Sequence, residues 1–387
     1  MFMVKERKKN KREAAKNGNS SATDERSTVR SLKTAADKGG SRTNVTIQQV
    51  AQRAGVSSMT VSRTLRNPGV VAEKTRQQVQ QAIDELNYIP DLSAIAMSSK
   101  QGTTVAVILP SLSFEGHVRT VDGLSSELRN RGFHLLISDN FYSESQELEV
   151  LRAVLGRRPA GIIMINSAHS DAGRDLIVNS GVPVIETWEL PSAPIDSVVG
   201  FSHYKVGFNL TEHLLACGYQ RIAFVGTREG VDRRANERMQ GFFECLTQYT
   251  KDTHRHIIMD EAPVSVAAGT KAIKQVMEKY PDTQAVITLT DRVAMGAIME
   301  CRRRGISVPE DLAIVGHGDF DFSEHLAPSL TTTRVDGFKI GTEAARLLMD
   351  KVNGDKALDE SIHIDVGFDV IVRESTLGSK GLSLIHI

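Results

Sequence analysis

The feature that most constrains the fold is a regular alternation of short apolar runs with longer amphipathic segments after residue 103. The apolar runs are TVAVILP, HLLISD, GIIMIN, VPVIET, RIAFVG, AVITLT and LAIVGH. Runs of this length, rich in Val and Ile, are typical of parallel strands that are buried on both faces. The segments between them, such as VRTVDGLSSELRNRG and YKVGFNLTEHLLACG, have helical periodicity and end at glycine. The pattern predicts a doubly wound α/β fold with parallel sheets, and a length of ~270 residues favours two lobes over one large sheet.

The segment before this region has a different pattern, which predicts three short helices. TIQQVAQRAG reads as a helix that Thr46 caps and Gly55 ends, and Ser57 caps the next helix after a short turn. EKTRQQVQQAIDELNYI predicts a third helix, with apolar residues at helical spacing: Val79, Ala82, Ile83 and Leu86. Three such helices can close one small core. Pro90 ends the unit, because the residue before a proline disfavours helix.

The second of these helices lies in GVSSMTVSRTLRN (55–67), which contains hydroxyls and arginines but no acidic residue. A helix–turn–helix places its second helix in the major groove of DNA, where a carboxylate would be repelled by phosphate. With Val61 and Leu65 directed into the core, the side chains that can contact bases are Ser58, Met59, Ser62 and Arg63. Arg63 can form a bidentate contact with guanine, worth about 1–3 kcal/mol of discrimination. Hydroxyls at the helix starts suit phosphate contacts: Thr46, Ser57 and Thr60. The alternative is an ordinary helical hairpin with a polar face.

The net charge of the chain is zero, but the charge is unevenly placed. Residues 1–44 hold twelve Lys and Arg against five Asp and Glu, an excess of +7 that the remainder balances with −7. Their composition, rich in Lys, Asn, Ser, Gly and Thr, predicts a disordered basic arm. This arm can serve for solvation alone or attract phosphate without sequence specificity, and the composition leaves both open.

The composition also excludes several classes of protein. Three scattered cysteines are too few for a disulfide framework or a metal cluster and predict reduced thiols: Cys217, Cys245 and Cys301. No apolar run reaches the ~18–20 residues of a membrane helix, and the lysine-rich N-terminus lacks the apolar segment of a secretory signal. We therefore expect a cytoplasmic protein with no membrane partner. No P-loop, G-x-S-x-G elbow, HExxH or dinucleotide fingerprint occurs, so we expect no enzyme, no cofactor and no metal.

The stretch VTIQQVAQRAGVSSMTVSRTLRNPGVVAEKTRQQVQQAIDELNYIPD follows the pattern VAxxAGVSxxTVSRxLN and then TRxxVxxAxxELxYxPN nearly throughout. In this the chain resembles the lactose-repressor (LacI/GalR) family, and the likeness extends over residues 45–377, to VIVREST at 370–376. Within the family it is most similar to gluconate- and idonate-type repressors, through stretches such as ILPSLS and VPVIETWELPSAPIDSVVGF. The resemblance implies an all-α helix–turn–helix headpiece and a two-lobed α/β effector domain of the periplasmic-binding-protein-like (type I) fold.

The resemblance also implies the domain boundaries. They are a basic arm (1–44), a DNA-binding domain (45–90), a hinge helix or linker (91–102), an effector-binding and dimerisation domain (103–377) and a tail (378–387). The two lobes comprise 103–197 with 335–364, and 198–334 with 365–377. Family members insert a hinge leucine into the minor groove, and the matching hinge positions here are Ala94 and Met97; methionine also serves as such a wedge. The tail has no heptad repeat, so we expect a homodimer and no coiled-coil tetramer.

Candidate effector-binding residues follow from the position of the strands. Ligands of open α/β sheets bind beyond the carboxyl ends of the strands. Polar and aromatic side chains at the ends of the apolar runs are Ser111, Asn166, Ser167, Glu186, Trp188 and Asp291. From the resemblance, Arg238 in RRANERMQGF and Asp291 match ligand-binding positions of the family. Arginine suits a carboxylate and aspartate suits paired hydroxyls, so a sugar acid would use both.

Each candidate has a structural alternative that the sequence leaves open. Arg238 can instead be a surface arginine, Asp291 the N-cap of the following helix, and Trp188 a core residue and not a ligand platform. The loop SFEGHVR departs from the SNPFFAE pattern of the family, and it leaves Phe114 and His117 as additional candidates. HRH at 254–256 is expected to lie in a solvated loop.

Together these features predict a homodimeric transcription factor, a repressor of genes for the uptake or catabolism of a sugar acid such as gluconate. Its expected partners are double-stranded operator DNA and a small sugar-acid effector bound between the two lobes. The alternatives are a regulator of another carbohydrate, a regulator that needs a co-repressor, and a transport-type sugar-binding protein. The headpiece argues against the last of these. An enzyme would need a positioned acid–base pair, which the sequence does not offer.

Overall fold

The computed structural model describes residues 45–90, 102–140, 143–227, 232–249, 255–259, 265–354 and 360–377. The chain divides into two compact units, Met1–Pro90 and Asp91–Ile387. The predicted basic arm, the hinge positions Ala94 and Met97, and the C-terminal tail lie outside the described residues. In the part of the chain that the structure describes, no helix is long and apolar enough to span a membrane.

The first unit is the predicted set of three helices. They are α2 (Ile47–Ala54), α3 (Ser58–Arg66) and α4 (Glu73–Leu86), with a short 3₁₀ helix η1 (Pro68–Val70) between the last two. Their core consists of buried apolar side chains at helical spacing: Val50, Ala51, Val61, Val79, Ala82 and Ile83. Leu65 and Leu86 pack against this cluster, as their positions in the pattern predicted.

The helix ends follow the predicted capping residues, with one difference. Thr46 caps α2 in a capping box, Gly55 ends it in a left-handed conformation with φ 67°, and Ser57 caps α3. The third helix is shorter than predicted. Asn87 has a left-handed φ of 49°, and its N–H donates back to the last turn, so α4 ends at Leu86. Asparagine tolerates this conformation better than most residues, which explains the early stop.

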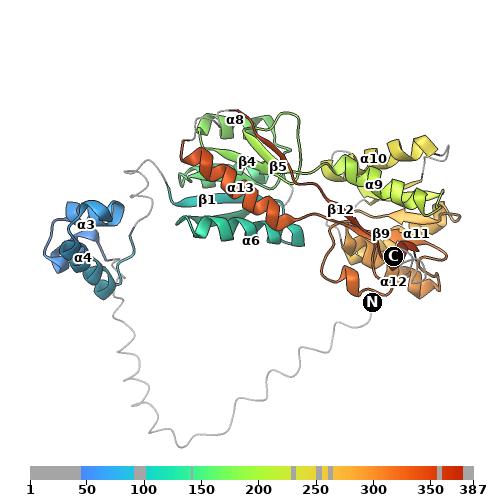
Figure 1. The fold of residues 1–387 in the computed structure, drawn as a ribbon, viewed down its shortest axis with the longest axis horizontal. Helices are drawn as coiled ribbons and strands as arrows, with labels where there is room; N and C mark the ends of the chain where they lie inside the picture. The colour runs from blue at the N-terminus through green and yellow to red at the C-terminus, as the bar shows by residue number, and fades with distance from the viewer. Residues whose placement is uncertain are drawn as a thin grey trace, which may run out of the picture. The chain divides into compact units, whose positions relative to one another are not determined.

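The second unit contains a six-stranded sheet in the order β11-β5-β4-β3-β1-β2, in which every neighbouring pair is parallel. Its strands are β1 (Thr104–Leu109), β2 (His134–Asp139), β3 (Gly161–Met164), β4 (Val184–Thr187), β5 (Ser197–Gly200) and β11 (His363–Asp365). The helices of this sheet are α6 (Glu115–Arg129), α7 (Glu144–Leu155), α8 (Asp171–Ser180) and α13 (Gly337–Val352). Figure 1 shows α6 and α13 next to each other on one side of the sheet and α8 on the other.

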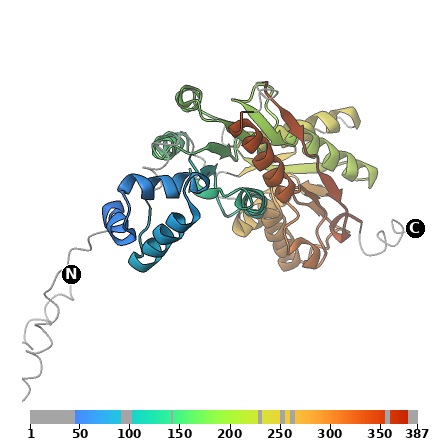
Figure 2. The same cartoon turned by 60° about the vertical axis from the view of Figure 1, so that its left-hand side comes forward.

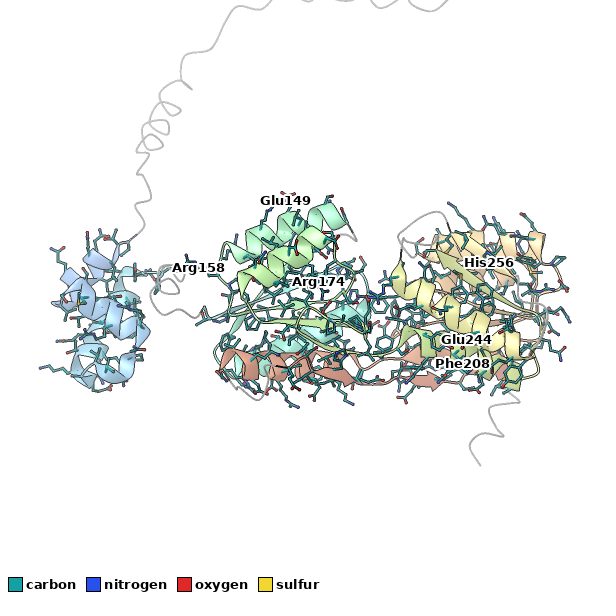
Figure 3. All side chains as sticks on the ribbon, turned by 90° about the horizontal axis from the view of Figure 1, so that it is seen from above. Glu149, Arg158, Arg174, Phe208, Glu244 and His256 are labelled. Carbon is teal, nitrogen blue, oxygen red and sulfur yellow. The ribbon has the colours of Figure 1, made fainter. Side chains whose placement is uncertain are left out.

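A second sheet of four parallel strands follows in the order β7-β6-β8-β9. Its strands are β6 (Ile222–Thr227), β7 (His256–Met259), β8 (Ala285–Ile287) and β9 (Ala313–Val315). Its helices are α9 (His203–Ala216), α10 (Arg233–Tyr249), α11 (Val266–Lys279) and α12 (Asp291–Arg304), and a 3₁₀ turn η2 (Ser323–His325) follows β9. Figure 3 shows Phe208 of α9 beside Glu244 of α10. The two helices pack together along their length. The predicted α/β fold with parallel sheets is confirmed.

The chain passes between the two sheets three times: after β5, after β9 and after β11. In the second and third connections, β10 (Thr332–Arg334) and β12 (Asp369–Ile371) pair as an antiparallel ribbon. The last connection, drawn in red, can be followed from one sheet to the other in Figures 1 and 2. Because each connection starts at the carboxyl end of a strand, the carboxyl ends of the two sheets are brought together.

The expectation of a solvated loop at 254–256 is wrong for the two of its residues that the structure describes. His256 begins β7, and Arg255 is only 9% exposed. The Arg255 guanidinium donates to both carboxylate oxygens of Asp282, at 2.6 and 3.0 Å, and lies over the ring of Tyr280. The Asp282 carboxylate and the Tyr280 ring allow Arg255 to be buried, although the polar sequence HRH predicted an exposed loop.

Candidate DNA-reading helix and inter-lobe site

Helix α3 separates its apolar and polar residues as the sequence predicted. Val61 is fully buried in the core of the first unit, while Met59 is 69% exposed and Arg63 is exposed. Ser58 and Ser62 are half-buried on the same outer side. The four side chains predicted to contact bases therefore all keep access to solvent.

The charges of the first unit favour a polyanion on this side. The first carboxylate after Thr46 is that of Glu73, so α2 and α3 carry none. Arg53 pairs with Glu85 and Arg76 pairs with Glu73. Within residues 45–90, neither Arg63 nor Arg66 is paired with a carboxylate, and the Arg66 guanidinium donates instead to the Ser62 carbonyl at 3.2 Å. Arginines without a carboxylate partner on an exposed helix face attract phosphate and can contact base edges.

The three hydroxyls predicted to contact phosphate all lie at helix starts. Thr46 accepts from the backbone N–H of Gln49, and Ser57 accepts from that of Thr60 at 3.1 Å. The Ser57 and Thr60 hydroxyls also bond to each other at 2.9 Å. In this structure they cap helices. Both caps are on exposed backbone, so the same atoms remain within reach of a phosphate oxygen.

In the second unit, Arg234 of α10 connects the two sheets at their carboxyl ends. Its Nε donates to Glu189, just after β4, at 2.7 Å, and an Nη donates to the Ile165 carbonyl, just after β3, at 2.7 Å. Glu189 also accepts from the Ser167 hydroxyl at 2.5 Å. One guanidinium of the second lobe thus meets two loops of the first lobe.

Arg238, one turn further along α10, lies in a second chain of contacts between the lobes. Its Nη1 lies 2.8 Å from Nδ1 of His203, and Nε2 of His203 lies 2.9 Å from the Trp188 carbonyl. A carbonyl only accepts and a guanidinium only donates, so His203 is protonated at Nε2 and accepts at Nδ1. Arg238 is 5% exposed, so the alternative of a surface arginine is wrong.

Three buried histidines face this pair of arginines. Burial, with the Arg234 charge, lowers the pKa of His117 to about 3. Burial and the charges of Arg238 and Arg234 also hold the pKa values of His203 and His317 well below the usual range. All three are therefore neutral at physiological pH. Their rings add no charge to the site, and in His203 and His117 both ring nitrogens already contact groups of the protein.

The region around Arg234 and Arg238, where the carboxyl ends of the two sheets meet, is called the junction below. Trp188 is part of the core there. It is 2% exposed, and its indole N–H donates to the Thr120 hydroxyl at 2.9 Å. Its ring packs edge-on against Phe114 and Phe201. A Cβ on Gly116 would lie 2.3 Å from the indole, so α6 can pack against the ring only because residue 116 is glycine. Of its two predicted roles, the geometry favours that of a core residue. A φ of 74° adds backbone strain of order 1–3 kcal/mol.

Asp291 is fully buried and held by three donors. Its carboxylate accepts from Thr332 at 2.6 Å, from Ser323 at 2.7 Å and from the backbone N–H of Phe320 at 2.8 Å. Burial raises the pKa of this carboxyl to about 6, although these hydrogen bonds oppose the shift. The N-cap position of α12 belongs to Thr290, so the alternative N-cap role of Asp291 is wrong. The carboxylate ties the segment after β9 to α12.

The remaining predicted effector residues lie in different surroundings. Ser111 is half-buried, and its carbonyl lies 2.9 Å from Nδ1 of His117. Ser167 is buried against Glu189. Glu186 is buried beside His169, with Oε1 at 3.3 Å from Nε2, and it accepts from the Ile195 N–H at 2.5 Å. The structure thus brings Ser167, Arg238 and the neighbours of Ser111 to the junction, whereas Glu186 belongs to a buried cluster with His169.

Sequence reasoning missed Arg234, Glu189 and His203, which form the contacts that run from α10 to the first lobe. A signal for Arg234 was present, because it precedes Arg238 by four residues in RRANERMQGF, and that spacing places both on one side of a helix. Glu189 and His203 also follow strands directly. Which residue after a strand turns inward depends on loop geometry, which no local pattern encodes.

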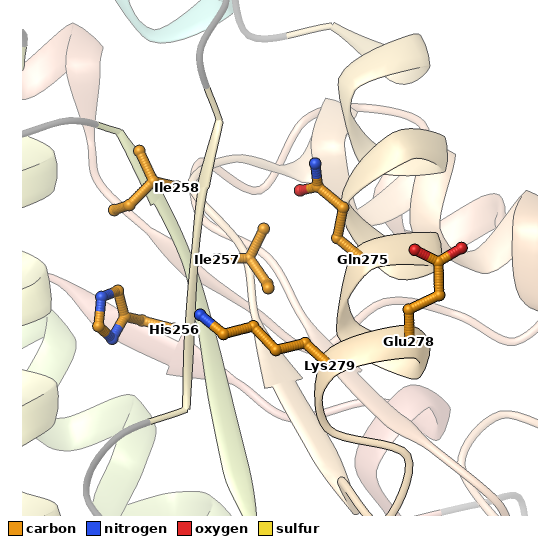
Figure 4. Close-up of a pocket in the computed structure, with 6 residues that line it drawn as sticks. All are labelled: His256, Ile257, Ile258, Gln275, Glu278 and Lys279. Carbon is orange, nitrogen blue, oxygen red and sulfur yellow. The ribbon is translucent and has the colours of Figure 1, made fainter.

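A separate hollow of about 460 Å³ lies beside β7 and α11. Figure 4 shows its lining: His256, Ile257, Ile258, Gln275, Glu278 and Lys279. Of the predicted effector residues, none lines it. Its walls carry one carboxylate and one ammonium group, without the paired guanidinium groups that gather at the junction of the sheets.

A helix–turn–helix with a carboxylate-free second helix, followed in the same chain by two parallel sheets with polar groups at their carboxyl ends, defines a DNA-binding regulator with a separate ligand-binding unit. The family model for bacterial regulatory proteins, lacI family, matches residues 46–91, and that for a periplasmic binding protein-like domain matches residues 211–376. The HTH-type transcriptional regulator GntR of Pseudomonas aeruginosa is 34% identical over 331 residues, which are 86% of this chain and 95% of that protein. The chain belongs to the lacI family of DNA-binding transcriptional regulators.

Solved structures agree with this assignment. A lacI-family transcriptional regulator from Silicibacter pomeroyi is similar with a TM-score of 0.79 and 29% identity, covering 86% of this chain and 99% of that one. The lac repressor dimer bound to operator and the anti-inducer ONPF is similar with a TM-score of 0.74 and 26% identity, covering 86% and 99%. These relatives are transcriptional regulators and not enzymes.

Proposed function

We propose that this regulator is a repressor of genes for sugar-acid uptake or catabolism and that it releases its operator when a gluconate-type sugar acid binds between the two lobes. The observation that supports this most is the pair of arginines on α10 at the carboxyl ends of both sheets. Arg234 and Arg238 reach the first lobe through Glu189 and His203. A planar guanidinium is the side chain best suited to hold a carboxylate.

The groups around the arginines suit the other end of a sugar acid. His117, His203 and His317 are neutral and buried, and Ser111 and Ser167 lie on the adjoining loops. Neutral rings line the site without adding charge, and hydroxyls both donate and accept hydrogen bonds, as polyols require. Of the predicted effector residues, we retain Ser111, Ser167 and Arg238 as contacts, assign Trp188 and Asp291 to shaping the walls, and leave Glu186 to its buried cluster with His169.

On the DNA side, we propose that α3 lies in the major groove with Ser58, Met59, Ser62 and Arg63 on the bases. Thr46, Ser57 and Thr60 then contact phosphate. A related structure is described as a lac repressor dimer bound to operator, which supports a homodimer here. A two-fold symmetric dimer reads a pseudo-palindromic operator.

Coupling between the two sites then runs through the segment between the units. We propose that residues 91–102 form a hinge helix on DNA, with Ala94 and Met97 at the minor groove. A short helix of this length is marginal alone, so a change in the spacing of the two hinges can decide whether it folds. An effector that shifts one lobe against the other changes that spacing.

The test is an isothermal titration of the purified protein with D-gluconate, for the wild type and Arg238→Ala. Loss of an arginine–carboxylate contact should weaken binding by about 10- to 100-fold, because a hydrogen bond to a charged group is worth about 1.5–3 kcal/mol. Operator affinity without gluconate should be unchanged in the variant. Arg302→Ala, at the exposed end of α12, is the control and should bind gluconate normally. Equal gluconate binding by Arg238→Ala and wild type would contradict the placement of the effector.

A further inference from the structure

We propose that Glu189 makes the inter-lobe site selective for singly charged sugar acids and against doubly charged ones. This inference rests on the function proposed above. It follows from one contact within the protein: the Glu189 carboxylate already pairs with the guanidinium of Arg234. Arg234 lies on α10, the helix that we propose to hold the carboxylate of the ligand.

The geometry fixes this carboxylate in place. Glu189 is 2% exposed and accepts from Arg234 Nε at 2.7 Å on one oxygen and from the Ser167 hydroxyl at 2.5 Å on the other. The Arg234 guanidinium is held in turn by the Ile165 carbonyl at 2.7 Å. A buried group bonded through both oxygens does not swing away when a ligand arrives, so its negative charge remains part of the site.

The Glu189 carboxylate also remains ionised. Burial alone would raise its pKa, but the Arg234 charge and the hydrogen bonds from Ser167 and Arg234 outweigh burial and lower the pKa below its usual value. The site therefore contains a permanent negative charge over the whole physiological pH range.

The other acidic groups nearby are engaged with partners of their own. Asp319 pairs with Arg334 at 2.6 Å and with Arg373 at 2.7 Å. Glu237 pairs with Arg233 at 3.0 Å on the outer side of α10. Asp291 is held by neutral donors at the start of α12, whereas Glu189 pairs with Arg234 and so offsets one of the two arginine charges at the junction itself.

A fixed charge of this kind discriminates by the charge of the ligand. It repels each negative charge that enters, so a dianion loses more binding free energy than a monoanion of the same size. At an effective dielectric constant of about 20, one additional unit charge at about 8 Å weakens binding by roughly tenfold or more. Removing the charge of Glu189 should remove that penalty.

The test compares D-gluconate with D-glucarate by isothermal titration at fixed salt. The two acids have the same six-carbon chain and differ by one terminal carboxylate, so size does not confound charge. The wild type should bind gluconate at least about tenfold more tightly than glucarate. In Glu189→Gln this ratio should shift towards glucarate by roughly tenfold. Glu237→Gln removes the same charge from the outer side of α10 and should leave the ratio near that of the wild type.

The outcomes separate this inference from the function on which it rests. If gluconate binds and the ratio is the same in Glu189→Gln and wild type, the selectivity role of Glu189 is wrong while the proposed function stands. If Glu189→Gln does not fold, the ratio of gluconate to glucarate affinity in the wild type is the test. Equal affinity of the wild type for the two acids would overturn the inference and leave the proposed function standing. If neither acid binds the wild type, the proposed function fails and the inference fails with it.

Discussion

Two buried histidines of the second unit show how neighbouring residues set the charge of a side chain. His203 accepts a hydrogen bond from Arg238 and is neutral. His169 lies 3.0 Å from Glu147 and 3.3 Å from Glu186. Burial alone would lower its pKa, but the hydrogen bonds and charges of these carboxylates raise it to about 9. The same residue type is therefore a hydrogen-bond relay in one place and a buried cation in the other.

The charge of His169 makes the stability of the protein depend on pH. A histidine whose pKa is higher in the folded state stabilises it fully below the unfolded pKa of about 6.5 and loses that contribution as pH rises to about 9. The contribution is about 3 kcal/mol. We expect His169→Gln to be less stable than wild type at pH 6, and the difference in free energy of unfolding in urea to shrink by about 3 kcal/mol by pH 10.

The exposed His325 provides the matched control for this measurement. Its side chain is 76% exposed, so His325→Gln should leave the pH profile of unfolding unchanged. A wild type that keeps the same advantage over His169→Gln from pH 6 to pH 10 would show that His169 is not a buried cation.

Single residues are also where prediction from the sequence reached its limit. Arg238 and Ser167 were expected at the junction, and the structure places both there. The sequence could place Trp188 after a strand, but whether its indole faces a ligand or the core depends on Gly116 and Thr120, more than sixty residues earlier. Side-chain direction at a loop is decided by such distant contacts, and one sequence does not display them.

At the scale of elements, α3 is the part of the molecule whose sequence and structure agree most fully. Its cap Ser57, its buried Val61 and its exposed Met59 and Arg63 all follow from local sequence spacing. Seven of the ten parallel strands that the structure describes were equally visible because each is an apolar run, whereas β5, β7 and β11 were not among the predicted runs. The ribbon of β10 and β12 was not, because its strands have three residues each and pair across a long stretch of chain.

The prediction at this scale concerns the reading of bases by α3. Arg63→Ala should cost about 1–3 kcal/mol on a specific operator and relax the preference at one base pair, since it removes a bidentate contact with guanine. Affinity for random duplex should fall much less. Arg76→Ala on α4, where the arginine pairs with Glu73, is the control and should keep the base preference. Equal losses on operator and random DNA for Arg63→Ala would make Arg63 a phosphate contact.

For the whole molecule, the alternation of apolar runs with helices predicted the fold class, and the size of that region predicted two sheets. The three passages of the chain between the sheets were expected from the family resemblance, through the two discontinuous lobes that it implies, and not from this alternation. These connections place the carboxyl ends of both sheets together, and they allow Arg234 to bond directly with groups of the other lobe and Arg238 to reach it through His203. A ligand at this junction touches both lobes, so its binding energy can change their relative position.

The central claim is that a sequence-reading helix is controlled by a sugar acid bound in the other unit. The most direct measurement selects a preferred duplex from a random pool, then compares it with a scrambled duplex by fluorescence anisotropy at fixed moderate salt, with and without D-gluconate. The account predicts a pseudo-palindrome bound about 10³-fold or more above the scrambled duplex. It also predicts that gluconate weakens binding to the palindrome and leaves the scrambled duplex unaffected. Equal binding of both duplexes, or a preference that gluconate does not change, would contradict it.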